Sequence, residues 1–195
     1  MWRLFWLIVL IGCSSDVTVK AEVVKLNSAA PCDKYSGLFS EGSNKSRFLA
    51  QCHQESLGNP LAKSPFAEGL MQFTPQTAEW AESSFCRHLG KARLTSAWWS
   101  AKCAEAYMSW IEERTPSDGS YCSTKRNAER GYNGGLGWLT REAKLTSDHS
   151  YDGLIQVCSD TGRALWACRE NSSYSDRISR HQKILYANHG GRQCQ

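Results

Sequence analysis

The side chain in this sequence best suited to acid–base chemistry is Glu55, a carboxyl group at the end of an apolar stripe. Phe48, Cys52 and Glu55 are four and three residues apart, so a helix places them on one face. The last turn before Gly58 is the negative end of that helix, which disfavours a charged carboxylate. Burial and dipole together raise the pKa, as a general acid near neutral pH requires. A carboxylate beside solvent at a helix end has the same spacing, and Glu55 alone favours that interpretation.

The residues after Glu55 favour the general acid over the solvent-exposed carboxylate, because they form two ordered motifs. The first motif consists of Glu55-Ser56, Asn59-Pro60, Ala62 and Ser64, and the second of Gly69-Leu70-Met71-Gln72 and Pro75-Gln76-Thr77-Ala78. In order and spacing they resemble the E-S-x-x-N-P-x-A-x-S and G-L-M-Q-x-x-P-x-T-A signatures of soluble lytic transglycosylases. The resemblance extends over residues 47–186 and implies a lysozyme-like fold with Glu55 as the acid/base catalyst.

The same resemblance implies roles for residues around the catalyst. Residues 69–72 would form an extended wall of a groove, with Met71 and Gln72 presented to the glycan. Ser64 would reach towards the sugar beside Glu55, and Ser56 would support the catalytic helix end.

A third segment, residues 128–137, resembles the family's A-x-A-Y-N-A-G-x-G motif. The family pattern implies that Tyr132 brings its hydroxyl to the catalytic carboxyl and the substrate, with Asn133 nearby. Taken alone, Tyr-Asn-Gly-Gly is typical of a helix that ends in a turn. Gly131 departs from the family, which often has alanine there.

A fourth segment, residues 170–178, resembles the late E-T-x-x-Y-V-x-x-I element less closely. Asn171 replaces the usual threonine and Ser175 the usual valine. By this resemblance Glu170 supports the site and Tyr174 lines the groove.

The activity that the resemblance implies is cleavage of the β-1,4 bond between N-acetylmuramic acid and N-acetylglucosamine in peptidoglycan, forming 1,6-anhydromuramoyl ends. Ordinary glycosidases use two carboxylates, whereas Glu68 occupies a variable place in the wall and Glu79 is expected on a surface turn. The alternatives are a muramidase on the same scaffold and a catalytically silent wall-binding protein. No cofactor, metal or nucleic acid is implied; the implied partner is the peptidoglycan strand.

The segments that must position these residues show the apolar spacing of helices. They run through residues 48–52, 99–110 and 178–185, and no convincing alternating strands occur. Ser46, Ser96 and Thr74-Pro75 are expected to begin helices, and Gly58 and Asn133-Gly134 to end them. The expected fold is mainly α, a lysozyme-like single domain over residues 32–195 with long, disulfide-stapled loops. Trp99 and Trp110 fall in the helical stripe and are expected in the core.

The nine cysteines indicate an oxidising compartment. Cys13 follows Leu10-Ile11-Gly12, which resembles the lipobox of bacterial lipoproteins, so lipidation would account for the odd cysteine. The other eight form an even set compatible with four disulfides, although 105 pairings are possible. They show no C-x-x-C spacing, which disfavours zinc.

The N-terminal apolar run, residues 4–11, is far shorter than the roughly 20 residues that a membrane-spanning helix needs. It favours a signal peptide over residues 1–12, followed by a lipid-anchored tether over residues 13–31. The alternatives are an uncleaved anchor or ordinary cleavage nearby. We therefore expect a lipoprotein at the periplasmic face of a bacterial membrane, or a phage virion or lysis component, and an envelope-spanning machine is a further candidate partner. The net charge of +4 is dispersed, without the basic footprint of nucleic-acid binding.

Lipidation predicts the behaviour of a Cys13→Ala variant. The change should move the protein from a detergent-requiring membrane fraction to a soluble or signal-uncleaved form, because the acylated sulfur is lost. Intact-mass measurement of the mature wild type checks the same point directly. A mature chain without diacylglycerol or acyl mass contradicts lipidation.

Overall fold

The computed structural model describes residues 30–42 and 44–194. The expected signal peptide, Cys13 and nearly all of the expected tether lie outside this range. The described residues are mainly helical and contain no β-sheet, as the sequence predicts. Two isolated bridges, Lys63 with Glu68 and Glu68 with Phe73, are the extended pairings recorded there. None of the helices in these ranges is long and apolar enough to cross a membrane.

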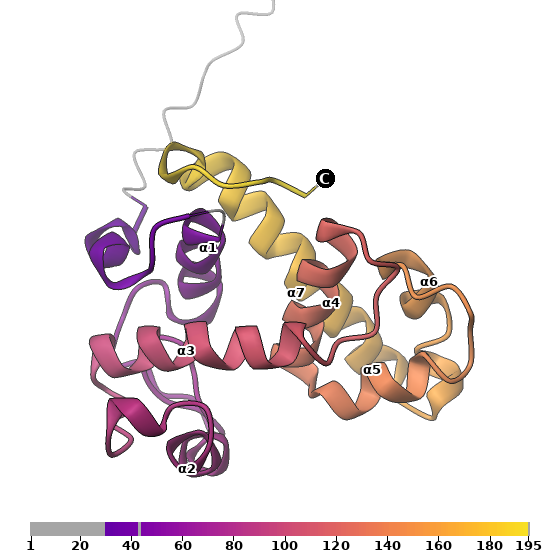
Figure 1. Cartoon of the computed structure of the whole chain (residues 1–195), viewed down its shortest axis with the longest axis horizontal. Helices are drawn as coiled ribbons and strands as arrows, with labels where there is room; N and C mark the ends of the chain where they lie inside the picture. Colours follow the sequence, from indigo (N-terminus) through magenta and orange to yellow (C-terminus); the bar gives the residue numbers. More distant parts are fainter. Residues whose placement is uncertain (1–29, 43, 195) are drawn as a thin grey trace, which may run out of the picture.

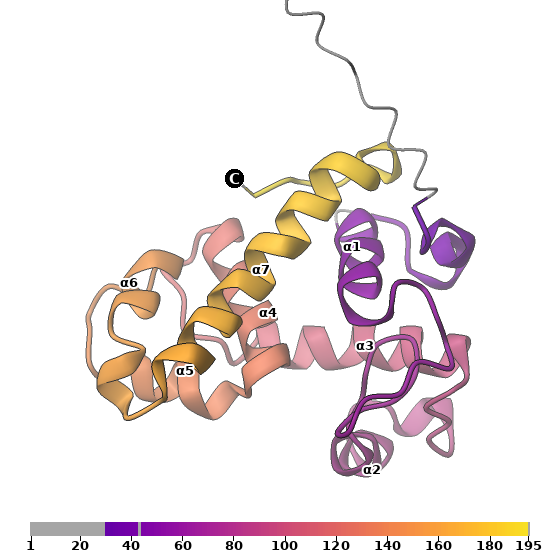
Figure 2. The same ribbon diagram turned by 180° about the vertical axis from the view of Figure 1, so that it is seen from behind.

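Four helices build the centre of the molecule: α1 (Lys45–Ser56), α3 (Ala97–Glu112), α4 (Tyr121–Gly134) and α7 (Leu165–Leu185). The long α7 packs against both α1 and α4. Figures 1 and 2 show it running diagonally past these two helices. The carboxyl end of α1 and the middle of α7 are thereby brought together across more than a hundred residues of sequence.

Shorter elements lie around this centre. α2 (Pro75–Ser83) lies towards one end of the molecule, and α5 (Leu136–Glu142) and α6 (Tyr151–Gln156) lie towards the other (Figure 1). The 3₁₀ turns are η1 (Asp33–Leu38), η2 (Arg87–Leu89), η3 (Ser159–Thr161) and η4 (Ala187–His189).

The helix starts confirm two of the three expected caps. The Thr74 side chain accepts a hydrogen bond from the Thr77 amide with Pro75 at the first helical position, and Ser96 accepts from the Trp99 amide. The expectation for Ser46 was wrong, because Asn44 is the N-cap residue and α1 begins at Lys45, two residues before the predicted start. Ser46 is buried inside the helix, and its hydroxyl accepts a hydrogen bond of 2.8 Å from the Gln182 side chain. A tertiary contact there replaces the local capping contact.

The helix ends lie close to the expected positions. After Ser56 the backbone turns through Leu57 and Gly58, both with positive φ, of 52° and 70°. α4 ends at Gly134, the second residue of the expected terminator Asn133-Gly134, and the chain turns at Gly135 with φ 89°. Both turns use the left-handed region, which favours glycine.

The core confirms Trp99 as a buried residue, with 1% of its surface exposed. Trp110 is half-buried instead, and packs edge-on against Trp80 and tilted against Phe85. These aromatic rings continue through Tyr107 to Tyr132 beside the functional motifs. An aromatic layer thus supports the α4 segment that carries the third motif.

All eight cysteines of the described domain are paired, as expected for an exported chain. The pairs are Cys32–Cys52, Cys86–Cys103, Cys122–Cys194 and Cys158–Cys168. The first of these cross-links the start of the domain to α1, three residues before Glu55. A native disulfide typically contributes about 2–4 kcal/mol, largely by restricting the unfolded chain.

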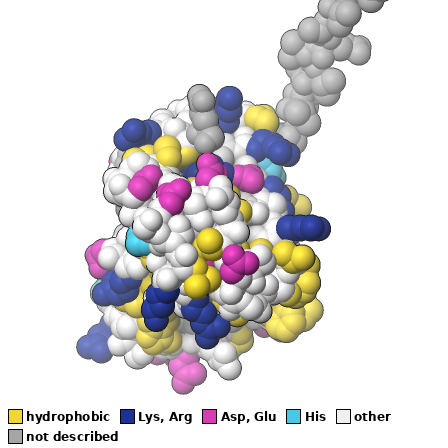
Figure 3. Space-filling view, turned by 90° about the vertical axis from the view of Figure 1, so that its right-hand side faces the viewer, with side chains coloured by type: hydrophobic (Ala, Val, Ile, Leu, Met, Phe, Trp, Pro, Cys, Tyr) yellow, Lys and Arg dark blue, Asp and Glu magenta, His cyan; other side chains and the backbone are white. Residues whose placement is uncertain are grey.

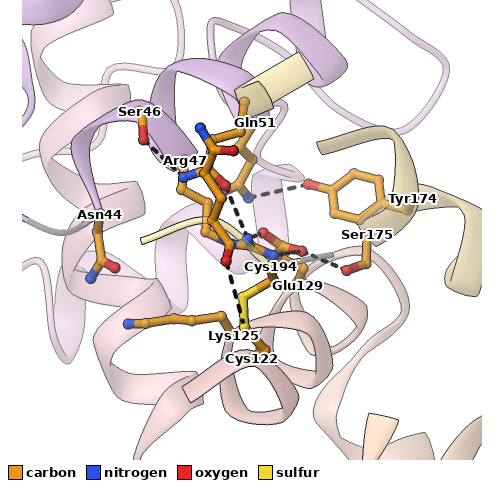
Figure 4. A network of polar contacts seen from close by, with 12 residues as sticks. Asn44, Ser46, Arg47, Gln51, Cys122, Lys125, Glu129, Tyr174, Ser175 and Cys194 are labelled. Atoms are coloured by element: carbon orange, nitrogen blue, oxygen red, sulfur yellow. Dashed lines mark hydrogen bonds and ion pairs between the residues drawn. A yellow bond between two sulfur atoms is a disulfide. The ribbon is translucent and has the colours of Figure 1, made fainter. Parts of the chain in front are cut away.

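A buried ion pair joins α1 to α4. Arg47 and Glu129 are 5% and 2% exposed, and the Arg47 Nη2 donates to Glu129 Oε2 at 2.7 Å. Ser175 on α7 donates to the same carboxylate oxygen at 2.7 Å, so three helices converge on it (Figure 4). A buried charge needs such partners because it has lost its hydration.

An Arg47→Met variant should lose about 3–5 kcal/mol of unfolding free energy, because Glu129 is left buried with its ion-pair partner removed. Lys63→Met is the matched control: Lys63 pairs with Glu68 at 2.7 Å but is 74% exposed, so about 1 kcal/mol or less should be lost. Urea unfolding measures both variants. Equal small losses would mean that the buried pair does not hold the helices together.

Candidate active site

Glu55 lies in the last turn of α1, with its carboxyl group turned towards α7. The residue is half-buried. Burial raises the pKa of its carboxyl from an ordinary 4.5 to about 7, against the smaller opposing effects of the Tyr174 hydrogen bond and the Arg177 charge. A substantial fraction of Glu55 is therefore protonated at neutral pH.

The hydroxyl in direct contact with this carboxyl belongs to Tyr174. It donates a short hydrogen bond to Glu55 Oε1, and it accepts one of 3.1 Å from the Gln51 amide. The sequence had assigned the contact to Tyr132, and this part of the prediction was wrong. The Tyr132 hydroxyl donates to the Met71 carbonyl oxygen at 2.8 Å. Burial raises the pKa of Tyr132 well above its ordinary value, and the charge of Glu55 raises it further.

The segment between α1 and α2, which the motifs predict as the wall of a groove, is folded back on itself by short extended pairings. Its bridges pair Lys63 with Glu68 and Glu68 with Phe73. Gly69 has φ 86°, and a Cβ there would overlap the Leu94 carbonyl oxygen, so only glycine fits. The wall is therefore fixed by backbone packing.

The two wall residues expected to face the glycan differ in placement. Met71 is fully buried, so the expectation that its side chain is presented to the glycan was wrong; its carbonyl instead holds Tyr132. Gln72 is half-buried with φ 49°, and its side-chain amide donates to the carbonyl oxygens of Ala62 and Gly69. Gln72 thus braces the wall from within.

The two serines of the first motif make local hydrogen bonds. The Ser64 hydroxyl accepts from the Ala67 amide at 3.0 Å and donates to the Ala67 carbonyl oxygen at 3.2 Å, closing a turn in the wall. The Ser56 hydroxyl donates to the Cys52 carbonyl oxygen at 3.3 Å, within α1. A contact between Ser64 and a sugar would have to compete with the bonds of its turn.

A small pocket of about 50 Å³ adjoins the wall. It is lined by Gln72, Phe73, Thr74, Thr77, Tyr107 and Tyr132. Its aromatic rings suit the apolar faces of a sugar ring. Asn133 is exposed directly after Tyr132, at the end of α4.

Glu170 reaches the site through an arginine. Its Oε1 pairs with Arg177 Nη2 at 2.5 Å, and the Arg177 charge in turn acts on Glu55. Glu170 is exposed and its carboxylate pairs with Arg177 rather than with Glu55, so a supporting role would run through Arg177.

Glu68 and Glu79, the next acidic residues after Glu55 in the sequence, do not supply a second carboxyl beside Glu55. Glu68 pairs with Lys63, and Glu79 is exposed within α2 rather than on the expected turn. No group of three or more histidine, cysteine or acidic side chains in the described ranges could hold a metal ion. The face in Figure 3 carries both basic and acidic side chains, in keeping with the small net charge of +4.

Two residues of the site escaped the sequence reasoning. Gln51 lies four residues before Glu55 and is 2% exposed, so a polar residue on the inward stripe was the available signal. Arg177 lies three residues after Tyr174 on the same helical face. Gln51 lies outside the quoted motifs, and Arg177 occupies a variable position of the fourth one.

The departures from the family pattern have local explanations. A Cβ at Gly131 would lie 3.0 Å from the Ile111 side chain, so alanine would be tight there. The Asn171 side chain accepts from Arg130 Nε at 3.1 Å and donates to the Arg130 carbonyl oxygen at 2.8 Å. An asparagine can make both bonds to Arg130, which is itself paired with the buried Glu142.

Comparison with models of protein families identifies the family of this chain. The model of the transglycosylase SLT domain matches residues 40–155, which include Glu55, the wall and Tyr132. The chain belongs to this family, whose members act on peptidoglycan. No curated protein matches the chain closely enough to be reported as a relative. The matched range ends before Tyr174.

The burial of Glu55 predicts a pH-dependent cost in stability. Because its folded pKa of about 7 exceeds the ordinary 4.5, the folded state binds the extra proton, and stability falls as pH rises through this window. Glu55→Gln removes this dependence. The stability of the variant relative to wild type should increase by about 3 kcal/mol between pH 4 and pH 9.

Urea unfolding at both pH values measures the difference, with Glu68→Gln as a control. The control should show a change below about 1 kcal/mol, because Glu68 forms a partly exposed pair. A Glu55→Gln curve parallel to wild type at every pH would contradict the raised pKa.

Proposed function

We propose that this protein is a lytic transglycosylase that cleaves the β-1,4 bond between N-acetylmuramic acid and N-acetylglucosamine and leaves 1,6-anhydromuramoyl ends. The observation that carries the proposal is Glu55: a carboxyl with a pKa of about 7, beside a wall and a tyrosine hydroxyl. Such a group can donate a proton and take one back near neutral pH.

In the proposed reaction Glu55 acts twice. As an acid it protonates the glycosidic oxygen while the bond from that oxygen to the muramoyl C1 breaks, releasing N-acetylglucosamine with a free 4-hydroxyl. As a carboxylate it then takes the proton from the muramoyl 6-hydroxyl, whose oxygen bonds to C1. Glu55 ends protonated, and no water is consumed. The Tyr174 hydrogen bond stabilises the carboxylate between the two steps.

The charges around Glu55 favour a mechanism with one catalytic carboxyl over a mechanism with two. A hydrolytic glycosidase places its second carboxyl about 5–9 Å from the first, where its charge would raise the pKa of Glu55. The charged neighbour that shifts this pKa is the cation Arg177, which lowers it. A muramidase on the same scaffold would replace the 6-hydroxyl by water.

The same proposal assigns a glycan groove to the surroundings of Glu55. Tyr132, Tyr174 and Asn133 would form its helical side, and the hydrogen bonds of Gln72 and Ser64 would stiffen the opposite wall. Met71 contributes its carbonyl to the position of Tyr132. Glu170 and Ser56 support Arg177 and the end of α1.

We also propose that the chain is exported and held at the membrane by a lipid on Cys13. Peptidoglycan lies outside the cytoplasm, and the four disulfides fit an oxidising compartment. A tether before the domain would then give the site a limited reach into the wall.

Release of dye from labelled peptidoglycan tests the catalytic role. Glu55→Gln should lower the rate by about 10²–10⁴-fold, because the amide keeps the shape but supplies no proton. In wild type the rate should fall towards tenfold per unit above pH 7, as Glu55 loses its proton. Glu79→Gln, an exposed change in α2, should keep wild-type activity. A Glu55→Gln rate within tenfold of wild type would refute the assignment.

A further inference from the structure

Gln51 lies one helical turn before Glu55 on α1, and its side chain is buried against α7. It is 2% exposed, and its Nε2 is 3.1 Å from the Tyr174 hydroxyl oxygen. The same oxygen donates to Glu55 Oε1. Figure 4 shows the Gln51 amide directed at the Tyr174 hydroxyl.

The two hydrogen bonds fix where the Tyr174 proton lies. A phenol has one proton to donate, and an amide nitrogen can only donate. Because Gln51 donates to the Tyr174 oxygen, the tyrosine proton remains available for Glu55. An ionised Glu55 has only acceptor positions, so this orientation suits its carboxylate form.

Gln51 belongs to a polar row at helical spacing on α1. Arg47, Gln51 and Glu55 are each four residues apart and thus share one face. Arg47 is held by Glu129, and Ser175, next to Tyr174, donates to Glu129. Glu129 therefore holds α1 through Arg47 and α7 through Ser175, and the Gln51–Tyr174 hydrogen bond forms between these two helices.

We propose that Gln51 is a positioning residue, which holds the Tyr174 hydroxyl as a donor to Glu55 so that the carboxylate formed after the first proton transfer is stabilised. The inference rests on the proposed function and deepens it. Without Gln51, the hydroxyl is free to rotate and to accept from a protonated Glu55, which favours the acid over the base.

The groups that face Glu55 come from two helices. On α7 they are Tyr174 and Arg177, and on α4 Tyr132 is coupled to its charge. Glu129 and Tyr132 act on Tyr174 in turn. The rings of His53 on α1 and His181 on α7 lie tilted against each other, and neither is among the groups that shift the Glu55 pKa. The Tyr174 bond is thus the contact through which Gln51 acts.

The test is a titration of the Glu55 carboxyl carbon by NMR in the full chain, together with pH–rate profiles. In Gln51→Met the Glu55 pKa and the alkaline limb of the rate should rise by about half a unit to one unit, the equivalent of one hydrogen bond. The kcat should fall several-fold with little change in KM. Gln51→Asn, which keeps an amide but shortens its reach, should behave like Gln51→Met and gives a second reading should the first variant fold poorly.

A double-mutant cycle separates positioning from structural support. In a Tyr174→Phe background, Gln51→Met should shift the Glu55 pKa no further, because the hydroxyl through which it acts is gone. Gln54→Met, on the same helix and half-buried, is the control and should leave the pKa unchanged. An additive shift in the double variant, or a fall in the Glu55 pKa in Gln51→Met, would overturn the inference.

The NMR titration needs no substrate, so the two proposals can fail separately. A shifted pKa in a protein that releases no glycan would refute the proposed function while showing that Gln51 orients Tyr174. An active enzyme with an unmoved Glu55 pKa in Gln51→Met would refute the role of Gln51 alone.

Discussion

The Arg47–Glu129 ion pair lies in the interior between α1 and α4, and Ser175 of α7 donates to the same carboxylate. Desolvated charges are costly unless their geometry is well satisfied, and breaking one partner away costs more than an exposed pair contributes. The three helices are thereby held in one arrangement. This constraint fixes α1 relative to α7. It therefore also fixes the position of Glu55, in the last turn of α1, relative to Tyr174 on α7.

The consequence at Glu55 is a balance of opposing effects. Burial favours the protonated carboxyl, while the Tyr174 hydroxyl and the Arg177 charge favour the carboxylate. The result is a pKa of about 7, between those of a buried and of an exposed glutamate. A single group that must both give and take a proton needs this intermediate position. Burial without hydrogen bonding would raise the pKa further, so that little of the carboxylate needed for the second proton transfer would form.

Local patterns predicted what depends on local spacing. The stripe of Phe48, Cys52 and Glu55 placed Glu55 at a helix end, and Thr74 and Ser96 begin helices as expected. The prediction that Ser46 caps α1 failed because the Ser46 hydroxyl instead bonds to Gln182, which is 136 residues away in the sequence. The tyrosine on Glu55 was misassigned for the same reason, since the Tyr174 contact spans 119 residues. The pairing of the eight cysteines likewise depends on the complete fold. Met71 was misplaced because the motif shows which residues form the wall but not which way each side chain points.

The central claim is that one carboxyl closes the sugar on itself instead of activating water. Mass spectrometry of the glycan ends formed in H₂¹⁸O tests it most directly, with wild-type protein and intact peptidoglycan. The account predicts anhydromuramoyl ends, lighter than reducing ends by one water and free of ¹⁸O. Reducing muramoyl ends that carry ¹⁸O would contradict it and identify a muramidase, and folded protein that releases no glycan would contradict catalysis altogether.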